Sequence, residues 1–337
     1  MASSLLLLGI TGDMAFAAGC LLQALRRHSP GLAADIRVYT DDALPESDVA
    51  LLRGLGADLV RYAPPDCALD PAALKLFSHM CLARLEAFRL LDRYRSVVWL
   101  DVDTAIQDDI SELFNWGPLS MALEDPHFTD AGTSRAGINI RGEVPGFDAA
   151  APNYNSGVLA LNGDLPDATG MYRQCMEMLR AYGPQLKYPD QAVLNLLMQA
   201  LLRDKPELAR VLPHDRFNAH PRNPASLRAA VMHAFGAYKL WDDGLTRCAF
   251  PEWQRDYLRW LSSGGSPWQG QVDNAEFLEG GPFFMLRRLF DSAEAAQEVL
   301  ERQQDELERE RALRVKLERF VAVMEQKNFD SRPGQDR

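Results

Sequence analysis

The sequence has few cysteines, and none of them are paired at the spacing of a metal or redox motif. Five cysteines are scattered over 337 residues, and no two form a Cys-x-x-Cys pair. Their number is odd and their spacing is irregular, so the pattern indicates neither a zinc site nor a disulfide framework. Such cysteine usage is typical of a reducing compartment, and we therefore expect a cytoplasmic protein.

Positive charge and long apolar runs are also scarce. The chain has 36 Lys and Arg against 47 Asp and Glu, a formal net charge of -11. A surface of this sign repels phosphate backbones, so we expect no nucleic-acid partner. No apolar stretch is long enough for a transmembrane segment. The first apolar run, residues 5–10, follows no basic residue, and it predicts a core strand instead of a signal peptide.

The chain does have enough apolar material for a large core, arranged in an α/β pattern. Hydrophobic residues make up 47% of the sequence and charged residues 25%, as in ordinary globular proteins. Short apolar runs alternate with segments of helical spacing, which predicts a mostly parallel sheet. The predicted strands include residues 36–40 and 57–62, and the predicted helices include residues 15–27, 48–55 and 71–92.

Two aspartates follow an uninterrupted apolar run in the middle of this pattern. Residues 97–100 are all apolar and lead directly to Asp101 and Asp103. Such a run predicts a strand buried on both faces, and ligands bind at the carboxyl ends of strands in open α/β sheets. Two carboxylates one residue apart can hold a divalent cation that still has coordination sites for phosphate oxygens. The alternative is an acidic loop after a core strand, because Asp-x-Asp alone is a weak motif.

Several turns in the chain are also candidates for a binding site. Thr11 to Asp13 joins the first strand to the first helix, where backbone amides can hold a nucleotide or Asp13 can cap the helix. Residues 126–152 are rich in Gly, Pro and polar residues, which predicts a long loop. Asn155 to Gly157 predicts a turn before another strand. Pro189 and Asp190 predict the start of a helix.

The last part of the chain has a different composition. Residues 301–319 are nearly all charged, with both signs mixed, and apolar residues recur at helical spacing. This pattern predicts an amphipathic helix or short coiled coil over residues 292–330, after a linker at 263–291 and before a disordered tail at 331–337. Balanced charge favours helix pairing over membrane binding, so we expect a homodimer formed through this helix.

Four short patterns occur in a fixed order along the chain: Trp99–Asp103, Tyr154–Asn162, Tyr188–Asn195 and His233–Trp241. Together they resemble glycosyltransferase family 8, the retaining group that includes glycogenin and the lipooligosaccharide galactosyltransferases. The resemblance implies a single GT-A domain, which is Rossmann-like with a mostly parallel sheet, over residues 1–262, followed by the helical tail. Leu240 departs from the family pattern, which usually has proline at this position.

The resemblance also implies roles for individual residues. Asp101, Asp103 and His233 resemble the metal ligands, with Mn²⁺ the usual ion and Mg²⁺ an alternative. Asp190 and Gln191 match the pair beside the anomeric carbon, and Lys239 matches a lysine that approaches the diphosphate, so these three are the catalytic candidates. The residues that match the donor-binding segments, besides the metal ligands, are Thr11, Asp13, Arg84, Val102, Asn155, Ser156, Gly157, Gly236 and Lys239.

The implied activity is transfer of a hexose with retention, from UDP-glucose or UDP-galactose to a glycan, lipid-linked or protein acceptor. Same-face attack is favoured over double displacement because the amide of Gln191 is a poor nucleophile. Two other functions stay open. A sugar-phosphate nucleotidyltransferase normally has a basic, glycine-rich first turn, and Thr11 to Asp13 contains no Lys or Arg. A non-catalytic scaffold acting through the C-terminal helix has no need of an intact metal site.

Overall fold

The computed structural model describes residues 4–41, 44–126, 134–236, 239–242 and 249–270, together with 304, 307–311 and 314 near the C-terminus. The chain divides into two compact units, Met1–Asp273 and Asn274–Arg337. In the second unit, the described residues are all helical. The rest of the predicted linker, tail helix and disordered end, and residues 127–133 of the predicted loop, lie outside the described residues.

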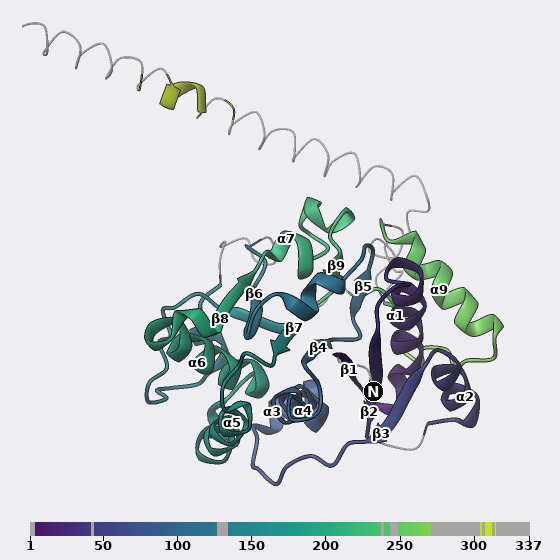
Figure 1. Ribbon diagram of the computed structural model, residues 1–337, viewed down its shortest axis with the longest axis horizontal. Coiled ribbons are helices and arrows are strands. Elements are labelled where there is room, and N and C mark those ends of the chain that lie inside the picture. The colour runs from purple at the N-terminus through teal and green to yellow at the C-terminus, as the bar shows by residue number, and fades with distance from the viewer. Residues whose placement is uncertain are drawn as a thin grey trace, which may run out of the picture. The chain divides into compact units, whose positions relative to one another are not determined.

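The first unit is built on a seven-stranded sheet (Figure 1). Its strand order is β3 (Ala57–Arg61), β2 (Ala34–Thr40), β1 (Ser4–Ile10), β4 (Ser96–Leu100), β7 (Tyr154–Asn162), β6 (Leu119–Leu123) and β8 (Ala209–Leu212). All neighbouring pairs are parallel except those of β7, which is antiparallel to both β4 and β6. The predicted mostly parallel sheet is therefore confirmed, with one antiparallel strand inside it.

Helices cover both faces of the sheet, which explains the uninterrupted apolar runs in its central strands. One face is covered by α1 (Ala15–His28) and α2 (Glu46–Gly54), and α9 (Pro251–Ser262) packs against α1 (Figure 1). Leu6 and Leu8 of β1 belong to the core on this face. Leu5 and Leu7 point to the other face, where α4 (Glu86–Leu90), α5 (Ala168–Tyr182) and α6 (Pro189–Asp204) pack. A strand with a core on each side has no polar face, so its side chains do not alternate.

Shorter elements complete the unit. A second sheet pairs β5 (Thr104–Ile106) with β9 (Val231–His233) in antiparallel fashion. Among the described residues, further α-helices are α3 (Pro71–Phe77) and α7 (His214–Phe217). The described 3-10 helices include Gly12–Met14, His79–Leu85, Ser111–Asn115, Ala136–Asn139, Gly183–Gln185, Pro206–Leu208 and Pro224–Leu227. Among the described residues, no helix has the length and apolar character needed to cross a membrane.

The single helix predicted over residues 71–92 is wrong. The chain breaks at Ser78, whose φ is 53° and ψ is -177°, so that α3 ends before it and a 3-10 helix begins after it. The Ser78 side chain accepts a hydrogen bond from the Met80 amide at 3.1 Å, which offers the backbone an alternative to continued helix. The break turns Arg84 into the core, where it is 7% exposed.

The turn predicted at Asn155 to Gly157 is also wrong, because these residues lie inside β7. Instead of a turn, these residues form an irregularity within the strand. Met121 of β6 pairs with Leu159, but the next residue of β6, Ala122, pairs with Asn155. The intervening residues of β7 have no partner in β6, so the strand bulges at this point.

The structure excludes one of the two roles considered for the turn from Thr11 to Asp13, in which Asp13 caps the first helix. Thr11 precedes the 3-10 helix Gly12–Met14, and α1 begins only at Ala15, after Met14. Asp13 is therefore not the N-cap of α1, and its carboxylate instead accepts a hydrogen bond from the Thr11 hydroxyl at 2.8 Å. Leu240, which stands where a proline was expected, is fully buried in the core.

Candidate active site

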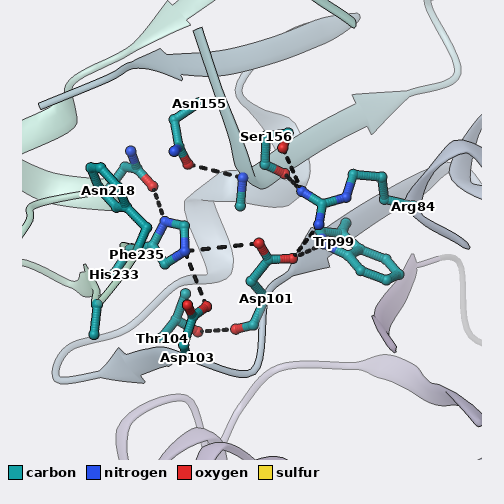
Figure 2. Close-up of polar contacts among 12 residues, drawn as sticks. Arg84, Trp99, Asp101, Asp103, Thr104, Asn155, Ser156, Asn218, His233 and Phe235 are labelled. Atoms are coloured by element: carbon teal, nitrogen blue, oxygen red, sulfur yellow. Dashed lines mark hydrogen bonds and ion pairs between the residues drawn. The ribbon is translucent and has the colours of Figure 1, made fainter. Parts of the chain in front are cut away.

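Asp101 and Asp103 lie directly after β4, as the sequence predicted. The Asp101 amide donates to the Gly157 carbonyl at 2.8 Å, which extends the pairing of β4 with β7 by one residue. The chain then turns into β5, where Thr104 is the register partner of His233 in β9. This pairing brings His233 to the two aspartates, and one ligand atom from each of the three residues lies within 4.8 Å of the others (Figure 2).

The His233 imidazole is oriented by contacts on both ring nitrogens. Nε2 lies 3.1 Å from Asp103 Oδ1 and 3.8 Å from Asp101 Oδ2. Nδ1 lies 2.8 Å from Asn218 Oδ1, to which it can donate (Figure 2). A proton on Nδ1 leaves the Nε2 lone pair facing the aspartates, which is the usual arrangement of a metal-binding histidine.

Gly157 is required for this approach. A Cβ added at position 157 would lie 1.9 Å from His233 Cε1, far below any real contact distance. His233 itself is 2% exposed, so it has no room to move aside. The glycine of the bulge in β7 therefore makes the space that the imidazole fills.

The electrostatics of the two carboxylates suit a bound cation. Burial raises the pKa of Asp103, but the Lys239 ammonium and His233 outweigh it and bring the pKa well below its usual range. Burial also raises the pKa of Asp101, and although Arg84 opposes this change, the net pKa stays raised. Two carboxylates and an imidazole form a donor set suited to a divalent transition metal, so these residues fit such an ion.

A second cluster, of Asp125, His214 and Asp215, also brings potential ligand atoms within 4.8 Å of one another. Here the Asn223 amide nitrogen donates to Asp125 Oδ2 at 2.8 Å and to Asp215 Oδ1 at 2.7 Å. A protein N–H group thus lies between the two carboxylates, and this cluster is explained as a hydrogen-bonded structural group.

Arg84 connects the aspartates after β4 to the start of α6. Its Nη2 lies 2.9 Å from Asp101 Oδ1 and its Nε lies 3.1 Å from Asp190 Oδ2. Its Nη1 donates to both the carbonyl and the hydroxyl of Ser156, at 2.6 Å each (Figure 2). Trp99 donates to Asp101 Oδ1 at 2.7 Å and lies beneath the guanidinium. Arg84 therefore holds three separate segments of the site together.

Asp190 and Gln191 occupy the first turn of α6, with Pro189 at its beginning as predicted. The Ser156 hydroxyl donates to Asp190 Oδ2 at 2.9 Å, and Gln191 Oε1 accepts from the Ser156 amide at 3.1 Å. Deeper in the helix, Asn195 donates to the Tyr154 carbonyl at 2.7 Å and accepts from the Tyr154 amide at 2.8 Å. These bonds fix the start of α6 against β7.

Lys239 lies after β9, beyond Gly236. Gly236 has a φ of 75°, a conformation that suits glycine. The Lys239 ammonium contacts Asp103 Oδ2 and donates to the Ala234 carbonyl at 2.9 Å. The lysine therefore lies beside Asp103, one of the two aspartates after β4.

A cavity of about 540 Å³ brings most of the predicted site together. Its lining includes these predicted residues: Arg84, Asp101, Asp103, Asn155, Ser156, Gly157, Asp190, Gln191, His233, Gly236 and Lys239. Thr11, Asp13 and Val102 do not line it. Thr11 and Asp13 follow β1, the parallel neighbour of β4, so they lie at the same edge of the sheet.

Sequence reasoning missed several residues of the cavity, among them Glu124 and Phe235. Glu124 is 4% exposed, and burial raises its pKa although the hydrogen bond from Ser134 opposes the change. It directly follows β6, so its place after a short apolar run was a usable signal. Asn218, which orients His233, gave no signal, because its role depends on a contact 15 residues away in the chain.

The chain is similar in sequence to one known protein family. The model of the family described as glycosyl transferase family 8 matches residues 5–244. A Haemophilus influenzae protein that is named as a candidate glycosyltransferase is 20% identical over 186 residues, which is 52% of this chain and 54% of that protein. The match thus spans about half the length of that curated relative.

Solved structures show the same fold. The galactosyltransferase LgtC, in complex with donor and acceptor sugar analogs, is 16% identical, with 77% of this chain and 99% of that chain covered at a TM-score of 0.56. An active-site mutant of LgtC is 18% identical, with 78% of this chain and 97% of that chain covered at a TM-score of 0.58. The bifunctional glycosyltransferase WbbM is 16% identical, with 77% of this chain and 52% of that chain covered at a TM-score of 0.55.

Proposed function

The chain belongs to glycosyl transferase family 8, has the GT-A fold and is a glycosyltransferase, and on this premise we propose a retaining hexosyltransferase that uses a UDP-sugar. UDP-glucose and UDP-galactose are the proposed donors, and a glycan or other glycoconjugate is the proposed acceptor. The observation that carries the proposal is the convergence of Asp101, Asp103 and His233 on one cavity with Arg84 and Lys239 beside them.

Asp101, Asp103 and His233 are the residues that would hold a divalent ion, Mn²⁺ or Mg²⁺. Such an ion, when bound, supplies positive charge to the diphosphate of the donor. Lys239 would add a second positive charge, since its ammonium already lies against Asp103. Arg84 holds Asp101 and Asp190 in place. Because its guanidinium already contacts Asp101, Asp190 and Ser156, Arg84 could bind the donor only if these contacts rearranged.

In the proposed reaction, the acceptor hydroxyl oxygen forms a bond to the anomeric carbon of the donor. The bond from this carbon to the β-phosphate oxygen breaks, its electron pair leaves with UDP, and the hydroxyl proton passes to that phosphate oxygen. Negative charge develops on the leaving phosphate, and Lys239 would stabilise it there. Entry and departure on the same face keep the anomeric configuration.

The contacts of Asp190 favour this route over a double displacement. Asp190 Oδ2 accepts from the Arg84 guanidinium at 3.1 Å and from the Ser156 hydroxyl at 2.9 Å. A carboxylate oxygen held by a cation and a hydroxyl donor is a weakened nucleophile, because both partners stabilise its charge before the reaction. Asp190 and Gln191 are therefore proposed to position the donor sugar and to stabilise its oxocarbenium-like transition state.

The proposal is tested by thermal unfolding with UDP and Mn²⁺, each alone and together. A ligand at about one hundred times its dissociation constant stabilises the folded state by about 2.7 kcal/mol. We expect UDP to stabilise the wild-type protein only with Mn²⁺, and Asp103→Asn to lose this response. Asp108→Asn, which changes an exposed carboxylate outside the cavity, is the control.

Two outcomes would contradict the assignment. A full response of Asp103→Asn to UDP and Mn²⁺ would remove Asp103 from the site. Stabilisation by nucleoside triphosphates without UDP binding would instead favour the nucleotidyltransferase alternative. Release of UDP from UDP-glucose or UDP-galactose, measured in the same preparations, then tells the two donors apart.

A further inference from the structure

The cavity has a charged base and an apolar mouth. Its charged side chains are buried or half-buried, and they belong to the site described above. Four other lining residues are among the eight large apolar side chains that are exposed in the described part of the chain. These four, here named the apolar collar, are Leu76 at 73% exposure, Phe77 at 39%, Ile138 at 37% and Tyr188 at 36%.

The collar is assembled from three segments that are far apart in the sequence. Leu76 and Phe77 end α3, Ile138 lies in the 3-10 helix Ala136–Asn139, and Tyr188 directly precedes α6. The Phe77 and Tyr188 rings lie 5.6 Å apart, centroid to centroid, at 59°. Exposed apolar residues scattered singly need no explanation, but a group of them around the mouth of one cavity indicates a binding surface.

The backbone directly after two members of the collar, Leu76 and Phe77, has a strained conformation. Ser78 has φ of 53° and ψ of -177°, a region that residues with a Cβ rarely occupy. This conformation ends α3 directly after Phe77. Strain that is kept at the mouth of a cavity is consistent with a functional constraint there.

The position of the collar fits the acceptor instead of the donor. A nucleoside diphosphate needs the Lys239 ammonium and the cation that Asp101, Asp103 and His233 would hold at the base of the cavity, and the collar offers it no charge. Tyr188 stands two residues before Asp190, beside which the donor sugar is proposed to lie. An acceptor whose hydroxyl reaches that sugar must extend outward past the collar.

We propose that the apolar collar binds the aglycone of the acceptor, and that the acceptor is a glycoside with an aromatic or alkyl group next to its sugar. The sugar hydroxyl points into the cavity toward Asp190, and the apolar group packs on Leu76, Phe77, Ile138 and Tyr188. The inference rests on the proposed glycosyl transfer and adds the chemical class of its acceptor.

Matched pairs of small glycosides test the inference. The probes are the p-nitrophenyl and methyl glycosides of glucose and galactose, offered with each UDP-sugar and Mn²⁺. We expect the p-nitrophenyl member of a pair to have a KM about tenfold lower, which is the effect of burying about 55 Å² of apolar surface. Binding of each glycoside in the presence of UDP and Mn²⁺ is measured by calorimetry alongside turnover.

Surface variants connect the preference to the collar. The double variant Leu76→Ser with Ile138→Ser should raise the KM of the p-nitrophenyl glycoside about tenfold, to that of the methyl glycoside. Binding of UDP with Mn²⁺ and slow hydrolysis of the UDP-sugar without acceptor should not change. Leu258→Ser, at a residue that is 57% exposed on α9 and outside the cavity, is the matched control and should keep the preference.

Three results would overturn the inference while leaving the proposed function intact. In the first, the wild-type protein does not distinguish the members of a pair, which includes the case that it binds neither of them. The double variant can keep the full preference. It can also lose thermal stability without any change in KM, which would show that the collar packs against the chain itself. Absence of UDP binding in the wild-type protein would instead refute the proposed function.

Discussion

Replacing Arg84 with methionine tests whether one buried cation holds the candidate site together. The Arg84 side chain is 8% exposed and contacts Asp101 at 2.9 Å and Asp190 at 3.1 Å. Methionine has a similar length and can fill the space next to Trp99, but it has neither charge nor donors. The substitution therefore leaves two carboxylates, whose side chains are 22% and 7% exposed, without their shared cation.

The expected loss of stability follows from this burial. Removing one partner of a buried ion pair costs about 3–5 kcal/mol, because the remaining charge is still kept from water. Asp190 is the more buried carboxylate, so it should contribute the larger share. Ser156 would also lose the two donors that now reach its carbonyl and hydroxyl oxygens. We expect Arg84→Met to lower the free energy of unfolding by about 3–5 kcal/mol at pH 8.

The loss should become smaller as the pH falls. Burial already raises the pKa of Asp101 in the folded state, and Arg84 is the main group that opposes this rise. Without Arg84, the folded state therefore binds a proton at Asp101 more readily than the unfolded state does. A group whose pKa is raised on folding gains stability as the pH decreases through that pKa. The difference between variant and wild type should accordingly be smaller at pH 5 than at pH 8.

Urea unfolding followed by circular dichroism at both pH values measures this difference. Arg89→Met is the matched control, because Arg89 lies on the next helical segment, is 56% exposed and pairs with Glu86 at 2.9 Å. An exposed pair of this kind contributes about 0–1 kcal/mol. If Arg84→Met costs no more than Arg89→Met, or costs the same at pH 5 and pH 8, the buried-pair reasoning is wrong.

Three further predictions concern other parts of the chain. Lys239→Ala should lower kcat more than it raises the donor KM, because its ammonium acts once the leaving group is charged; steady-state kinetics with a changed KM alone would contradict this role. Burial lowers the pKa of His220 to about 4, so the wild type should lose about 2–3 kcal/mol more stability than His220→Gln between pH 7 and pH 4.5 in urea unfolding, and equal losses would refute it. Truncation after Phe290 should give a monomer by light scattering that keeps donor turnover, and a full-length protein that is already monomeric at micromolar concentration would exclude pairing through the tail.

The parts of the fold that the sequence predicted are those determined by local pattern. The strand before Asp101 and the start of α6 at Pro189 follow from apolar runs and helix-start residues that act within a few positions. The break at Ser78 was missed because it depends on one unusual backbone conformation that apolar spacing does not encode. The burial of Arg84 is not marked by any local pattern either, since its partners come from β7 and α6.

The grouping of distant residues into the candidate site could be predicted only where the family resemblance supplied long-range information. Asp101 and Asp103 were candidates from their place after a strand, but nothing local connects them to His233. The pairing of β5 with β9 makes that connection across 130 residues. Asn218, which fixes the imidazole from the other side, had no motif to mark it. Contacts between residues so far apart in the sequence depend on the packing of the whole domain, which cannot be read from a single sequence.

The antiparallel direction of β7 is what allows one short motif to serve both the sheet and the site. Had β7 run parallel to β4, its beginning would lie at the opposite edge of the sheet from Asp101. Because it runs antiparallel, Gly157 lies directly opposite Asp101 and accepts its amide at 2.8 Å. The same glycine leaves the space that His233 fills, and the neighbouring Ser156 binds Arg84 and Asp190. The bulge in β7 then frees these residues from β6, so they can face the cavity without interrupting the strand.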